Sequence, residues 1–141
     1  MRVSDWKRLL VYHHSSNCLD SLASVWILKS ALDNQGFAGE YVVREVNFKE
    51  PPNDLGDGLF DAVFILDNTS HVDWFTERYP GTVYCFDHHS GGQPIEHPSR
   101  LQMLVLSLFK GAPSTCMLMM ALFPNAKLTH EQVAKIELIG R

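Results

Sequence analysis

An unbroken apolar run at residues 61–67 constrains the fold of this chain more than any other feature. Five apolar residues follow Asp61 without alternation, and Asp67 closes the run. A strand with one face in water alternates apolar and polar residues, whereas a strand buried on both faces of a parallel sheet does not. The run therefore predicts a central strand of a parallel sheet whose two faces are covered by helices.

The other segments alternate between strand-like and helix-like patterns. Gly36 follows one helical segment as a stop signal, and Ser114 precedes another as an N-cap. This alternation predicts a single α/β domain, residues 1–141, with a five-stranded, mostly parallel sheet and helices on both faces in three αβα layers. The predicted strands are residues 9–12, 41–46, 61–67, 82–86 and 101–106, and the predicted helices are residues 19–34, 72–79, 115–122 and 131–139.

Composition excludes several classes of protein. The hydrophobic content of 45% and charged content of 20% are those of a globular chain, not a disordered one. The net charge of −4 argues against a general nucleic-acid binder held by bulk electrostatics. Three distant cysteines indicate neither a disulfide framework nor a four-cysteine zinc site, so we expect a reducing compartment, the cytoplasm or the mitochondrial matrix. The longest apolar run, residues 117–123, is too short to span a membrane, and no clear targeting signal precedes the first strand.

Three of the predicted strands end in residues that can bind metal. His14 follows the first strand with Asp20 just beyond, Asp67 ends the central strand, and residues 87–89 (Asp-His-His) follow a third. The carboxyl ends of parallel strands lie on one edge of a sheet, so these groups are expected to converge. Carboxylates and imidazoles together suit a divalent ion such as manganese, magnesium or zinc.

Each of these residues also has an ordinary structural explanation. Asp20 suits a helix N-cap, Asp67 a turn at the end of a strand, and residues 87–91 a polar turn. Cys18 is typical of a small buried residue, and His13 of a residue that closes a strand. The pattern of residues alone leaves both explanations open.

The order of the motifs resembles the DHH phosphoesterase family, which includes RecJ-type exonucleases, nano-RNA and cyclic-dinucleotide phosphodiesterases, family II pyrophosphatases and prune-like proteins. The family's first motif is a histidine with aspartates four and six residues later, and His14, Cys18 and Asp20 stand at those positions. Its second motif is an apolar strand that ends in aspartate, as at Asp67, and its third is the Asp-His-His of residues 87–89. The resemblance covers nearly the whole chain.

The resemblance implies a site for manganese, magnesium or zinc and a role for each matching residue. His14 would bind one metal ion, and Cys18 would replace an aspartate ligand. Asp20 would bind a second ion, and Asp67 would bridge the two.

The Asp-His-His motif would complete this implied site. His88 would bind the second ion, Asp87 would orient His88, and His89 would face the substrate phosphate. These roles imply hydrolysis of a phosphodiester or phosphoanhydride by a metal-activated water. The expected substrate is a phosphorylated small molecule or a short oligonucleotide.

Three departures from the family pattern bear on activity. The thiol of Cys18 shifts the expected metal preference of the site towards zinc. No acid lies between Glu96 and Glu131 to supply the aspartate of the fourth motif, and Lys110 falls near its place. The C-terminal domain that family enzymes close over the substrate is expected to be absent from residues 1–141.

Two hypotheses follow from the sequence. The first is a metal-dependent phosphoesterase with an incomplete site, in which each metal ion lacks one expected protein ligand. The second is a catalytically degenerate DHH-fold subunit that serves as a structural component of an oligomer or a larger protein assembly. The nearly uncharged segment at residues 103–123, in which Lys110 is the exception, motivates a protein partner for the second hypothesis.

Overall fold

The computed structural model describes residues 2–15, 17–46, 49–56, 59–67, 71–86, 101–102, 116, 119, 126, 129 and 131. Its centre is a sheet of five strands in the order β2-β1-β3-β4-β5, and every neighbouring pair is parallel. The predicted parallel α/β sheet is therefore confirmed. The strands are β1 (Arg8–His13), β2 (Glu40–Glu45), β3 (Ala62–Leu66), β4 (Val83–Phe86) and β5 (Leu101–Gln102).

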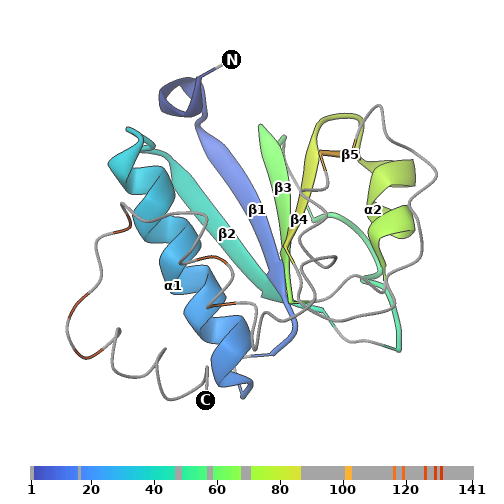
Figure 1. The fold of residues 1–141 in the computed structure, drawn as a ribbon. Coiled ribbons are helices and arrows are strands. Elements are labelled where there is room, and N and C mark those ends of the chain that lie inside the picture. The colour runs from blue at the N-terminus through green and yellow to red at the C-terminus, as the bar shows by residue number, and fades with distance from the viewer. Residues whose placement is uncertain are drawn as a thin grey trace.

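Helices cover both faces of this sheet (Figure 1). A short 3-10 helix, η1 (Val3–Asp5), precedes β1, and the two longer helices within residues 2–86 are α1 (Leu19–Asn34) and α2 (Val72–Arg78). One core forms where α1 packs on Leu9, Val11 and Phe64, and the other where α2 packs on the alternate strand residues, such as Leu10 and Ile65. All five residues of β3 are buried, as the unbroken apolar run predicts.

Helix α1 begins and ends where the sequence predicts, but Asp20 lies in its first turn and is not the N-cap. Cys18 is the N-cap residue, and Gly36 follows the helix with a φ of +98°. The Gly36 and Phe37 amides donate to the carbonyl oxygens of Asp33 and Leu32, at 3.0 Å each. These are the two bonds of a Schellman motif, which needs a residue with positive φ at the position of Gly36.

The ends of the predicted elements can be compared with the structure over the described residues. His13 lies inside β1, one residue beyond the predicted strand end, because it pairs with Glu45 and Leu66 on either side. Cys116, Met119 and Glu131 are helical as predicted, while the rest of the two predicted C-terminal helices and residues 103–106 lie outside the described residues. None of the described helices is long and apolar enough to cross a membrane.

Burial raises the pKa of all four tyrosines, to about 12 for Tyr79. Because an unfolded chain releases the same protons near pH 10, the folded state binds more protons than the unfolded state between pH about 10 and about 12. The free energy of unfolding should therefore fall as the pH rises through that window. Urea unfolding at a series of alkaline pH values tests this.

Tyr79→Phe provides the internal comparison. The variant lacks one of the groups with a raised pKa, so its unfolding free energy should fall less steeply with pH than that of the wild type. If the unfolding free energies of the two proteins fell equally steeply with pH, Tyr79 would not be one of the groups with a raised pKa.

Candidate metal centre

The first part of the site lies between β1 and α1. His13 is the last residue of β1 and is 3% exposed, and His14 follows it in a half-buried position. Cys18 caps the start of α1, but its side chain makes no capping hydrogen bond. Cysteine is not a favoured N-cap residue.

The second part of the site is Asp67, directly after β3. Its side chain is buried, and its backbone has a φ of +62°, in the left-handed region. The amide of Asp67 donates to the carbonyl oxygen of Phe86 at 2.8 Å, which holds this conformation against the next strand. Non-glycine residues with positive φ are uncommon and are concentrated at functional sites, although aspartate tolerates the region better than most.

Sheet register brings the two parts together. β1 and β3 are neighbours, and His13 pairs with Leu66, so His14 and Asp67 leave the sheet at the same level. The ligand atoms of His14, Cys18 and Asp67 all lie within 4.8 Å of one another, and the Cys18 Sγ is 3.7 Å from Asp67 Oδ2. In the strand order 2-1-3-4-5, the β1/β3 boundary is the switch point at which open α/β sheets bind ligands.

Asp20 lies near Cys18 but outside the cluster. Its Oδ1 accepts a 2.7 Å hydrogen bond from the backbone amide of Cys116, which is buried and helical. The cluster of three potential ligands does not include Asp20. One carboxylate oxygen of Asp20 is therefore engaged by a backbone amide 96 residues further along the chain.

Comparison with known proteins shows a likeness of fold. No protein-family model matches the sequence, and a search of curated proteins finds no significant match. Among solved structures, the chain is similar to the exonuclease RecJ bound to manganese, with a TM-score of 0.52 and 18% identity. The similarity covers 94% of this chain but 38% of the exonuclease. At this identity the likeness shows the fold alone.

The donor set of the cluster fits a divalent ion of borderline softness. Imidazole, thiolate and carboxylate are all zinc ligands, and imidazole and carboxylate also suit manganese. Magnesium fits less well, because it prefers oxygen ligands throughout. Burial raises the pKa of the Cys18 thiol; the backbone amides of Ser21 and Asp20 oppose this rise, and the nearby charges of Asp67 and Asp20 add to it. The thiol must therefore release its proton when it binds a cation.

Two side chains beside the cluster were not identified as important from the sequence. The buried His13 has its Nδ1 2.7 Å from the Ser21 Oγ, and Ser21 itself has no exposed surface. Burial lowers the pKa of His13, which keeps its ring neutral near pH 7, although the charge of Glu45 opposes this effect. In the sequence, the contact between His13 and Ser21 is indicated only by the His13-His14 pair and by a serine in the first turn of the predicted helix.

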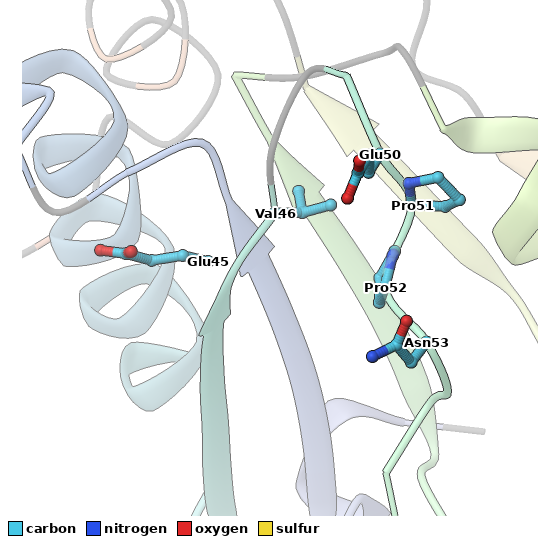
Figure 2. A pocket seen from close by; sticks show the side chains of 6 residues that line it. All are labelled: Glu45, Val46, Glu50, Pro51, Pro52 and Asn53. Atoms are coloured by element: carbon cyan, nitrogen blue, oxygen red, sulfur yellow. The ribbon is translucent and has the colours of Figure 1, made fainter.

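A hollow of about 230 Å³ lies beside the end of β2 (Figure 2). Val46, just beyond that strand, donates its amide to the carbonyl oxygen of His13 at 2.8 Å, so the hollow adjoins the strand that carries the cluster. Glu50 contributes a carboxylate to its lining, which would repel a phosphate group, whereas the carboxylate of Glu45 points away from the other lining residues (Figure 2). The hollow is therefore a poor place for the phosphate of a substrate.

The structure thus brings together three of the predicted site residues, His14, Cys18 and Asp67. It places Asp20 on the Cys116 amide. The predicted residues Asp87, His88 and His89 lie outside the described residues.

Proposed function

We propose that this chain binds a divalent metal ion through His14, Cys18 and Asp67 and hydrolyses a phosphodiester or a phosphoanhydride. The observation that carries the proposal is the convergence of three ligand atoms within 4.8 Å at the β1/β3 switch point. Three protein ligands are the number found in catalytic zinc sites, where a fourth position stays open for water or substrate.

Each residue has a defined part in this proposal. His14 supplies a neutral nitrogen, Cys18 a thiolate and the buried Asp67 a carboxylate whose charge is little screened by solvent. A divalent ion held there would supply Lewis-acid chemistry, by polarising a phosphoryl oxygen and lowering the pKa of a water molecule. Following the DHH resemblance, His88 would add a ligand, Asp87 would orient it, and His89 would contact the substrate phosphate.

The ligand types indicate which metal and substrate to test. The thiolate of Cys18 favours zinc, while the similar exonuclease structure was bound to manganese. The proposed substrate is a phosphorylated small molecule or a short oligonucleotide. The free thiols of Cys18, Cys85 and Cys116 fit a reducing compartment such as the cytoplasm or the mitochondrial matrix.

A second candidate is a DHH-like subunit that retains the fold and has lost activity. Two observations favour it: the Asp20 carboxylate caps the Cys116 amide, and no acid between Glu96 and Glu131 supplies a further ligand. In this case the chain would act as a structural component that contacts a protein partner or another copy of itself.

Metal content and turnover separate these two candidates. We expect the purified protein to contain zinc or manganese by elemental mass spectrometry, and to hydrolyse bis(p-nitrophenyl) phosphate or pyrophosphate when either ion is added. Cys18→Ala should abolish both properties, because it removes a ligand. Cys85→Ala is the matched control, since Cys85 is a buried cysteine on β4 and outside the cluster.

The outcomes decide between the candidates. Bound metal and turnover that are lost only in Cys18→Ala would support the enzyme and remove the case for the degenerate subunit. Bound metal without turnover on either substrate would overturn the proposed hydrolysis. If the protein showed neither bound metal nor turnover, the proposed metal site would be overturned as well.

A further inference from the structure

The hydroxyl group of Ser21 connects both neighbours of His14. Ser21 Oγ lies 2.7 Å from His13 Nδ1, and it accepts a 3.2 Å hydrogen bond from the backbone amide of Ser15. His13 and Ser15 flank His14 in the sequence, so one oxygen atom fixes the chain on each side of that residue. We call these two contacts the Ser21 bridge.

The loop that leads to Cys18 is tied to the same point. The amide of Cys18 donates to the carbonyl oxygen of Ser15 at 3.1 Å, and the amide of Leu22 donates to the carbonyl oxygen of Cys18 at 3.0 Å. Ser15 therefore links the Ser21 bridge to the backbone of the thiol ligand. His14 and Cys18 both depend on a framework that Ser21 holds together.

Burial makes the Ser21 bridge difficult to replace. Ser21 has no exposed surface and His13 is 3% exposed, so water does not take over these hydrogen bonds easily. A serine hydroxyl offers one proton and two lone pairs, so it can accept from the Ser15 amide and still pair with either tautomer of the imidazole.

We propose that Ser21 and His13 are positioning residues, which hold the backbone around His14 and Cys18 in the geometry that binds the metal ion. The inference rests on the proposed metal site and adds two residues that do not touch the ion. Hydrogen-bonded groups that orient metal ligands change affinity by about 10–100-fold when they are removed. Ser21→Ala should accordingly weaken metal binding about tenfold or more without removing any ligand.

Ser24→Ala is the matched control. Ser24 lies on the same helix and is equally buried, but its hydroxyl donates at 2.8 Å to the carbonyl oxygen of Asp20, within one turn of the helix. Both variants lose a buried hydroxyl and are expected to lose stability. Only Ser21→Ala should also lose metal affinity.

A pair of variants at His13 tests the other end of the Ser21 bridge. His13→Leu fills space without a polar group and should weaken binding as Ser21→Ala does. His13→Asn places a polar atom close to the position of the imidazole Nδ1 and should restore affinity. This pair also keeps the inference testable if Ser21→Ala does not fold.

The measurements are the affinity of the full chain for Zn²⁺, by competition with a chromophoric chelator, and the visible spectrum of the Co²⁺ form. We expect wild type, Ser24→Ala and His13→Asn to share one affinity and one spectrum, and Ser21→Ala and His13→Leu to differ from them in both. If wild type and Ser21→Ala bound Zn²⁺ equally tightly, the inference about Ser21 would be overturned, while the proposed metal site would stand. A wild type that binds neither ion would overturn the proposed site and the inference with it.

Discussion

Replacing Asp67 with asparagine should lower the affinity of the chain for Zn²⁺ by more than ~100-fold while the protein still folds. The loss should exceed the roughly 10–100-fold effect of groups that only orient ligands, because Asp67 is itself a proposed ligand and supplies a negative charge from a buried position. Asparagine is the informative substitution, since it has nearly the same shape and tolerates the φ of +62° that alanine would find strained. Isothermal titration with Zn²⁺ and urea unfolding measure the two effects separately.

Asp61→Asn is the control for this experiment. Asp61 lies at the opposite end of the same strand, where its carboxylate accepts hydrogen bonds from the amides of Lys7 and Arg8 at 2.8 and 3.0 Å. Asp61→Asn should change stability and leave Zn²⁺ affinity unaltered. If Asp67→Asn bound Zn²⁺ as tightly as Asp61→Asn does, Asp67 would not be a ligand.

The fold and part of the site could be predicted because both depend on short-range patterns. Five consecutive apolar residues identify β3, since only a strand covered on both faces can keep them from water. Once β1 and β3 are parallel neighbours, their shared register places His14 beside Asp67 without further information. The convergence of these two residues is therefore a consequence of topology.

The contact between Asp20 and Cys116 could not be predicted in the same way. The partner of Asp20, the Cys116 amide, lies 96 residues further along the chain, and a backbone donor has no signature in the sequence. The Ser21 bridge was missed for a related reason, because hydrogen bonds to Ser21 depend on the direction in which the His13 ring leaves the end of β1. Residue types can identify the groups that are able to bind metal, but side-chain direction decides which of them lie together.

Asp20→Ala should destabilise the chain by about 1–3 kcal/mol, because it leaves the buried amide of Cys116 without the acceptor at 2.7 Å. Asp20→Asn keeps an oxygen that can accept this hydrogen bond, so it should retain most of the stability. Urea unfolding of the metal-free proteins tests this difference. Asp73 is the matched control: it is the second residue of α2, as Asp20 is of α1, but it is exposed, so its replacement should cost only the ~0.3–1 kcal/mol of a helix-dipole interaction.

The same pair of variants assigns the function of Asp20. The DHH resemblance implies that Asp20 binds a second metal ion, and in that case Asp20→Asn would lose metal even though it folds. The hydrogen bond to Cys116 instead makes Asp20 a cap that joins the start of α1 to the C-terminal part of the chain. We therefore expect Asp20→Asn to keep both the stability and the Zn²⁺ affinity of the wild type. Loss of one bound ion per chain in Asp20→Asn, with unfolding unchanged, would restore Asp20 to the metal site and would indicate a two-metal centre.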